Sequence, residues 1–211
     1  MDTAGPDLEA SIAGCQIAHR RLRMTLGSLD DDAVGGPSRL PGWTIGHALS
    51  HLARNAESHV RVLAGALAGD HLEQYEGGRE ARAAGIEAGA GRPAHVLIDD
   101  VISTFAQLED TWTKMTPAAW DGYGISSSGA VWPCRHLPFS RWREVEVHHV
   151  DLGLGYETSD WPAAYVSAEL PIAAAGLAER VSDPASRAGL LGWLLGRDEQ
   201  PGEIRLSPWR A

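Results

Sequence analysis

The chain has 211 residues, a formal net charge of −10 and 44% hydrophobic residues, which is enough for one sizeable core and argues against disorder. The acidic balance, with one lysine and no basic cluster, argues against a partner with a phosphate backbone. We find no signal peptide, no apolar run near the roughly 20 residues that span a bilayer, and too few cysteines for a secreted disulfide scaffold. We therefore expect a cytoplasmic protein without nucleic-acid or membrane partners.

Four stretches repeat apolar side chains at steps of three and four, the spacing of amphipathic helices. They cover residues 7–28, 45–68, 93–114 and 138–152. Asp7 and Thr44 are suited to cap the first two helices, and Gly153 is suited to end the last. Long helices without strand-like alternation predict a mainly α helix bundle.

The connecting segments are rich in Gly, Pro and Asp. We expect a loop over 30–41, an irregular or weakly helical segment over 71–92, and a long connection with room for a short hairpin over 116–137. The predicted domains are a bundle over 1–157 and a small C-terminal region over 158–211. That region contains two helical patterns, 162–180 with a kink or break expected at Pro171 and 185–195, and one short strand over Glu203 to Leu206.

Two pairs of residues have the spacing of metal ligands. His47 and His51 lie four apart on a predicted helix, so they share one face, and either could bind a metal. Glu144 and His148 have the same spacing on the last bundle helix. Bundle metal sites are built from such inward side chains on facing helices. Taken separately, each pair is also compatible with ordinary surface residues.

Together the two pairs offer imidazole and carboxylate donors to one cation. Two imidazoles and one carboxylate with open positions match catalytic zinc sites and non-haem iron(II) sites alike. The ligand types therefore predict a divalent metal without fixing its identity.

Other residues with reactive side chains have simpler interpretations. His19 falls on the apolar face of the first helix, where we expect a buried histidine with a hydrogen-bond partner, and Cys15 on the same face is expected to be packed. Cys134 and His136 form an alternative pair in a predicted loop, for which a catalytic role is disfavoured.

Three segments resemble the mycothiol-dependent maleylpyruvate isomerase family, which belongs to the DinB-like metalloenzymes. They read LPGWTIGHALSHLARNAESH, YEGGREARAAGIEAGAGR and REVEVHHVDLG, in the order and spacing of the family, and GLLGWLLGR near the end adds to the match. The similarity covers most of residues 8 to 155. It implies a DinB-like four-helix bundle, and the C-terminal region looks abbreviated beside the mixed α/β domain of the family.

The resemblance also implies a ligand set. Residue by residue, the family's metal, usually zinc, would be held here by His51, Glu144 and His148, and His47 would be a neighbour. The low-molecular-weight thiol of the family is mycothiol, which would be the cosubstrate. Arg82 and Arg197 match family arginines suited to anchor an anionic substrate, because a guanidinium can bind a carboxylate with two hydrogen bonds.

Two further polar residues lie one helical turn from the expected ligands. Asp151 could accept a proton from the His148 ring or could cap the helix, and Asn55 could line the site or simply contribute to bundle polarity. We assign both to cofactor binding.

The leading hypothesis is a metal-dependent, thiol-assisted cis–trans isomerase of a maleylpyruvate-like diacid. One alternative is a mycothiol S-transferase that conjugates an electrophile, and another is a non-catalytic DinB-like protein that binds metal. An isomerase regenerates the free thiol, whereas a transferase consumes it.

Overall fold

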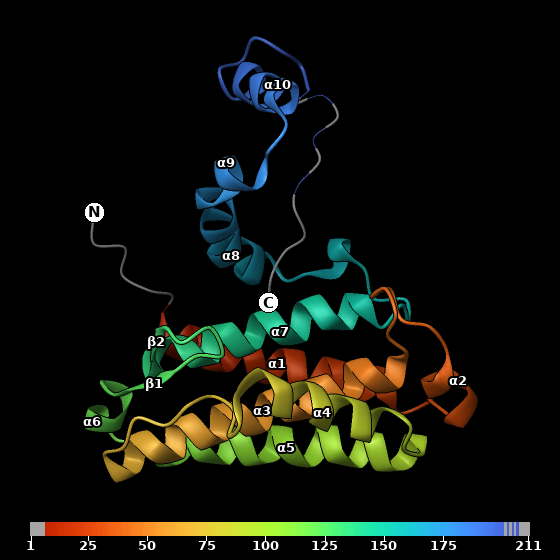
Figure 1. Ribbon diagram of the computed structural model, residues 1–211, viewed down its shortest axis with the longest axis vertical. Helices are drawn as coiled ribbons and strands as arrows, with labels where there is room; N and C mark the ends of the chain where they lie inside the picture. Colours follow the sequence, from red (N-terminus) through yellow and green to blue (C-terminus); the bar gives the residue numbers. More distant parts are fainter. Residues whose placement is uncertain (1–6, 201, 203, 205, 207–211) are drawn as a thin grey trace. The chain divides into compact units, whose positions relative to one another are not determined.

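The computed structural model describes residues 7–200, 202, 204 and 206. Packing divides the chain into two compact units, residues 1–161 and 162–211. The first unit contains the long helices, shown from red to teal in Figure 1. The domain boundary expected after residue 157 stays a prediction.

Four long helices form the first unit, as the sequence predicts. They are α1 (Leu8–Leu26), α3 (Ile45–Ala68), α5 (Ala94–Lys114) and α7 (Leu137–Asp151). Helix α1 packs along α7, α3 packs along α5, and α3 also contacts α7 (Figure 1). The core between them contains buried leucines such as Leu22, Leu49, Leu63, Leu97 and Leu108, together with several buried polar and charged side chains. Burial of the leucines holds the helices together.

The helix ends follow the predicted capping residues. Asp7 accepts a hydrogen bond from the Ala10 backbone N–H at 2.7 Å. Thr44 accepts from the His47 backbone N–H at 3.3 Å, and the Nδ1 atom of His47 accepts from the Thr44 backbone N–H at 3.2 Å. This reciprocal cap satisfies two backbone donors at the start of α3, and it uses the Nδ1 atom of His47 as a hydrogen-bond acceptor.

Two connections are more ordered than the sequence predicts. The expected loop over 30–41 contains a short helix, α2 (Asp31–Gly35), capped by Asp30. The segment 71–92 contains a regular helix, α4 (Gly78–Ala90), whose glycine content led to the expectation of irregular structure. Helix α4 packs on α3, and that packing supplies the stability that its intrinsic propensity lacks.

The third connection contains the expected hairpin. A short helix, α6 (Pro117–Trp120), is followed by β1 (Tyr123–Ile125) and β2 (Val131–Pro133), which pair antiparallel with Ile125 opposite Val131. A 3₁₀ turn, η1 (Cys134–His136), then leads into α7. Trp132 of the hairpin lies edge-on to the ring of His59, a fully buried histidine of α3, with the ring centroids 4.9 Å apart.

The segment after α7 returns to the bundle through polar contacts. It contains a second 3₁₀ turn, η2 (Thr158–Asp160). Tyr156 donates to the buried carboxylate of Glu146 at 2.5 Å, and Arg21 of α1 lies 3.3 Å from the same carboxylate. These contacts fix the end of the first unit to α1 and α7.

The second unit is helical. It contains α8 (Ala163–Ala175), α9 (Leu177–Arg180) and α10 (Pro184–Leu194). Of the kink or break expected at Pro171, a break is excluded, because helix α8 continues through the proline to Ala175. The strand expected over Glu203 to Leu206 includes two positions, 203 and 205, that lie outside the described residues.

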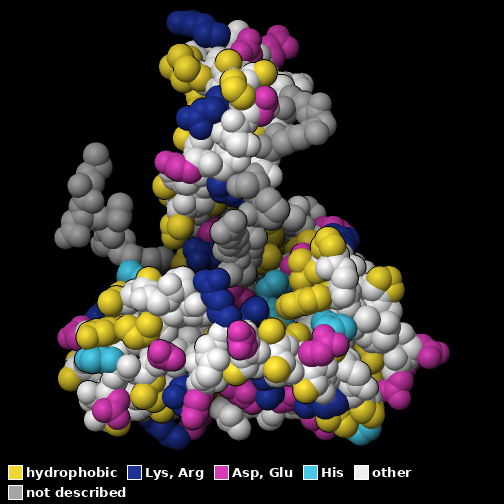
Figure 2. Space-filling view, in the orientation of Figure 1, with side chains coloured by type: hydrophobic (Ala, Val, Ile, Leu, Met, Phe, Trp, Pro, Cys, Tyr) yellow, Lys and Arg dark blue, Asp and Glu magenta, His cyan; other side chains and the backbone are white. Residues whose placement is uncertain are grey.

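The surface of the first unit carries charged side chains of both signs. Acidic and basic side chains are interspersed over the face of the first unit that Figure 2 shows. None of the helices in the described part of the chain is both long and apolar enough to cross a membrane.

The contact between α3 and α4 requires glycine at Gly46. A Cβ atom there would lie 2.2 Å from the carbonyl oxygen of Ala90. This oxygen belongs to the backbone, so it cannot move away as the end of a flexible side chain could. We predict that Gly46→Ala lowers the free energy of unfolding by about 1–3 kcal/mol, measured by urea denaturation. Gly85→Ala is the matched control, because a Cβ there meets only Arg54 side-chain atoms, at 3.7 Å or beyond. It should be neutral or stabilise α4 by up to about 1 kcal/mol. Equal stability of the two variants would contradict the close approach.

Candidate metal centre

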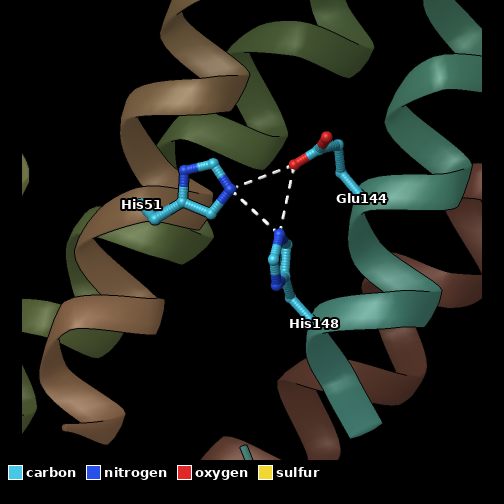
Figure 3. Close-up of side chains that lie close together, drawn as sticks. All are labelled: His51, Glu144 and His148. Carbon is cyan, nitrogen blue, oxygen red and sulfur yellow. Dashed lines mark hydrogen bonds and ion pairs between the residues drawn. The ribbon is translucent and has the colours of Figure 1, made fainter. Parts of the chain in front are cut away.

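Three side chains from two helices converge inside the bundle. His51 projects from α3, and Glu144 and His148 project from α7 toward the same point (Figure 3). The His51 Nε2 atom lies 3.0 Å from Glu144 Oε2 and 3.0 Å from His148 Nε2. The third edge, His148 Nε2 to Glu144 Oε2, measures 3.4 Å. All three side chains are buried.

The helices explain why these side chains meet. Glu144 and His148 lie one turn apart on α7, so both face α3, which packs against α7. His51 lies in the second turn of α3, which is fixed at its start by the Thr44 cap. The convergence therefore follows from spacing along α7 and from the packing of α3 on it.

A contact from Asp151 orients the His148 ring. The His148 Nδ1 atom lies 2.8 Å from the Asp151 carboxylate, which can only accept, so the ring donates its Nδ1 proton. The Nε2 atom then faces the cluster, where it becomes a metal ligand once a metal displaces its proton. A carboxylate behind a ligand imidazole is the usual arrangement at metal sites, where it fixes the ring and raises its basicity.

Arg82 approaches His51 from the opposite side. Its Nη2 atom, from α4, lies 3.1 Å from His51 Nδ1, and its guanidinium carbon lies 5.9 Å from the centre of the Tyr75 ring. Arg82 also lines a surface pocket of about 280 Å³ between α3 and the 74–85 segment. Arg82 thus contacts His51 and also forms part of the wall of this pocket.

Burial and the contacts among the three residues shift the pKa of each of them. Burial lowers the pKa of His51 to about 4 and outweighs the hydrogen bond to Glu144. Burial also disfavours charge on His148, yet the contacts with Asp151 and Glu144 prevail and raise its pKa to about 9. Burial would raise the pKa of Glu144, but the two histidines hold it well below its ordinary value. The carboxylate is therefore ionised and available as a donor.

The donor set suits a divalent metal. One donor atom from each residue lies within 4.8 Å of the other two. Tetrahedral zinc bound at its usual distances separates its ligand atoms by roughly 3.3 Å, close to the three distances above. Three protein donors would leave a further coordination position open, as in catalytic zinc sites.

The other residues proposed from sequence have different surroundings. The amide oxygen of Asn55 accepts from Arg141 Nη1 at 2.6 Å inside the bundle. His47 caps α3 and lies 3.2 Å from Glu87, and it is not part of the cluster. Arg197 belongs to the second unit, where its backbone N–H donates to the Gly192 carbonyl at 2.8 Å. Roles for Asn55, Asp151 and Arg197 in binding stay predictions.

Sequence reasoning missed two residues beside the cluster. The Trp43 ring lies with its centre 5.7 Å from that of His51 and forms an aromatic wall. Arg141 is fully buried and lies three residues before Glu144, on the same side of α7. That spacing was a usable signal, because a charged residue one turn from a ligand faces the same interior.

A comparison with family profiles matches residues 15–153 to the profile described as "Mycothiol maleylpyruvate isomerase N-terminal domain". The match spans more than half of the chain and includes His51, Glu144 and His148. The chain belongs to this family. The resemblance stated from the sequence segments is thereby confirmed. The matched region ends at residue 153, before the second unit begins.

Two solved structures are similar in fold to this chain. A histidine-to-alanine mutant of the mycothiol-dependent maleylpyruvate isomerase is similar with a TM-score of 0.76 and 25% identity, over 83% of this chain and 72% of that chain. Another crystal structure of the mycothiol-dependent maleylpyruvate isomerase gives a TM-score of 0.73 at 24% identity, over 87% and 72%. The expected DinB-like, mainly α fold is confirmed. A comparison with curated proteins gave no significant match.

Proposed function

We propose that this member of the mycothiol maleylpyruvate isomerase family is a metal-dependent enzyme that isomerises a maleylpyruvate-like cis-diacid with mycothiol as cosubstrate. The observation that carries the proposal is the convergence of two imidazoles and one carboxylate on a single point. His51, Glu144 and His148 would hold a divalent metal, with zinc the first candidate. When bound, the metal would lower the pKa of a thiol and favour the thiolate.

The reaction requires reversible addition of the thiol. The thiolate forms a carbon–sulfur bond with the activated alkene, and the π electrons move to the neighbouring carbonyl as an enolate. The former double bond is then single and rotates. Collapse of the enolate expels the thiolate and forms the trans alkene, so the thiol is regenerated and no oxidant or reductant is needed.

The residues of the chain would bind and orient the reactants. Arg82 is placed to bind one carboxylate of the substrate, because its guanidinium is next to His51 and no carboxylate of the described residues forms an ion pair with it. Arg197 is the second anchor proposed from the sequence. Burial of the cluster would exclude water and strengthen each electrostatic contact.

The metal ligands are tested by metal analysis of purified variants. We expect wild-type protein to contain stoichiometric zinc, and His51→Ala and Glu144→Ala to lose it, because each removes one of three protein donors. His47→Ala is the matched control, since it removes a histidine one turn away that caps α3, and it should keep the metal. Full metal content in either ligand variant would remove that residue from the site.

The reaction is tested with maleylpyruvate and mycothiol. We expect the cis substrate to disappear with formation of the trans isomer while the free thiol, titrated with a disulfide reagent, stays constant. Thiol consumption matching substrate loss would identify an S-transferase instead. If metal-loaded protein produces neither change with these reagents, the isomerase proposal fails.

The anchoring role of Arg82 is tested by kinetics. Arg82→Ala should raise the KM for a dianionic substrate about 10- to 100-fold, the cost of one charge-assisted hydrogen-bonded pair. Arg79→Ala is the control, because Arg79 lies one turn earlier on α4 and donates to the Ser127 carbonyl on the exposed surface. An equal KM for the two variants would exclude Arg82 from substrate binding.

A further inference from the structure

Arg141 has an unusual position for a charged residue. Its side chain is fully buried, and within the described part of the chain no carboxylate forms an ion pair with it. Its Nη1 atom donates to the Leu52 carbonyl at 3.1 Å and to Asn55 Oδ1 at 2.6 Å, both on α3. Its guanidinium carbon lies 4.7 Å from the centre of the Phe105 ring on α5. Keeping a charge inside a bundle is costly, so its contacts require an explanation.

His19 of α1 holds the other side of the guanidinium. The His19 Nδ1 atom lies 2.7 Å from Glu109 of α5, so the ring donates to that carboxylate and presents Nε2 as an acceptor. The Arg141 Nε–H donates to this Nε2 at 3.4 Å. Burial lowers the pKa of His19 to about 4, which keeps the ring neutral near pH 7. Arg141 of α7 therefore contacts all three other long helices.

The same cluster resembles a Cys–His–Glu catalytic triad, but burial argues against that function. The Cys15 thiol lies 3.6 Å from His19 Nε2. It is fully buried, and burial raises its pKa well above the ordinary value, so the reactive thiolate is not formed. His19 is better understood as the residue that holds Arg141.

The contacts of Arg141 lie beside the metal cluster. Arg141 is three residues before Glu144 on α7, and its acceptors on α3 are Leu52, next to His51, and Asn55, one turn further along. The guanidinium thus joins the turn of α3 that carries one imidazole to the turn of α7 that carries the carboxylate. The distance between these turns determines how far apart the donor atoms lie.

We propose that Arg141 is a positioning residue, held by His19 and Glu109, that sets the spacing between the α3 and α7 donors and thereby the metal affinity of the site. This inference rests on the proposed metal site. It assigns a buried arginine that touches no substrate to the assembly of the site.

The variant Arg141→Met tests positioning when it is compared with a control that is destabilised to a similar degree. Methionine cannot donate to Asn55 Oδ1 or His19 Nε2, so two buried acceptors lose their donor and the protein should be less stable than wild type. Loss of a residue that supports metal ligands typically weakens metal binding 10- to 100-fold. We therefore expect Arg141→Met to raise the Kd for Zn²⁺ at least about 10-fold, measured by competition with a chromophoric chelator under conditions where urea denaturation shows the metal-free variant to be folded. The absorption spectrum of the Co²⁺-loaded protein should also change, because it reports the ligand geometry.

A second variant acts from the far side of the guanidinium. His19→Phe keeps an aromatic ring next to Phe105, with which His19 stacks at 3.9 Å, but removes the acceptor of Arg141 Nε. It should also raise the Kd for Zn²⁺, but by a smaller factor than Arg141→Met does. If Arg141→Met does not yield folded protein, His19→Phe decides the question alone.

Glu146→Gln is the matched control. Glu146 is equally buried on α7, but its carboxylate contacts Arg21, Trp142 and Tyr156, and within the described part of the chain it forms no hydrogen bond with Arg141 or His19. It should lower stability and leave the Kd for Zn²⁺ within about twofold of wild type. A wild-type Kd and Co²⁺ spectrum in Arg141→Met, or an equal loss of affinity in the control, would overturn the positioning role. Wild-type protein that binds no metal would instead refute the proposed metal site itself, and this inference with it.

Discussion

The packing of α3 on α7 is the constraint on which the rest of the site depends. Each helix alone presents an ordinary row of polar side chains, and neither carries enough donors for a metal. Their contact places His51 opposite Glu144 and His148 at hydrogen-bonding distances. Because the cluster is buried, its members must be partnered by one another, by neighbouring residues or by a ligand. The helix contact thus creates both the geometry and the need for a partner.

Much of this arrangement could be predicted from the sequence. The four long helices follow from apolar spacing, and the caps at Asp7 and Thr44 follow from residue type. The pairing of Glu144 with His148 follows from their separation on one helix. The choice of His51 over His47 did not follow from spacing, since both share a face; it came from the family resemblance. The structure provides the physical reason, because the His47 ring caps its own helix.

The parts that sequence reasoning missed depend on contacts between distant segments. Helix α4 contains several glycines, which predict weak helicity, but glycine at positions 46 and 89 lets α3 and α4 approach closely. The hydrogen-bond partners of Arg141 are 86 to 122 residues away in the chain, so no local pattern indicates them. Local spacing can show that such a residue faces inward, whereas its partners are determined only by the packed fold.

The buried histidines outside the cluster affect how the fold responds to acid. Burial lowers the pKa of His19 to about 4 and that of His59, beneath Trp132, to about 3, so both stay neutral in the folded protein. In the unfolded chain each would titrate near pH 6.5. Between these values the unfolded state binds more protons than the folded state. The contribution of these two histidines to the free energy of unfolding is therefore complete above pH 6.5 and is lost as the pH falls toward 4. Unfolding of this bundle is therefore a proton-consuming reaction in mildly acidic solution.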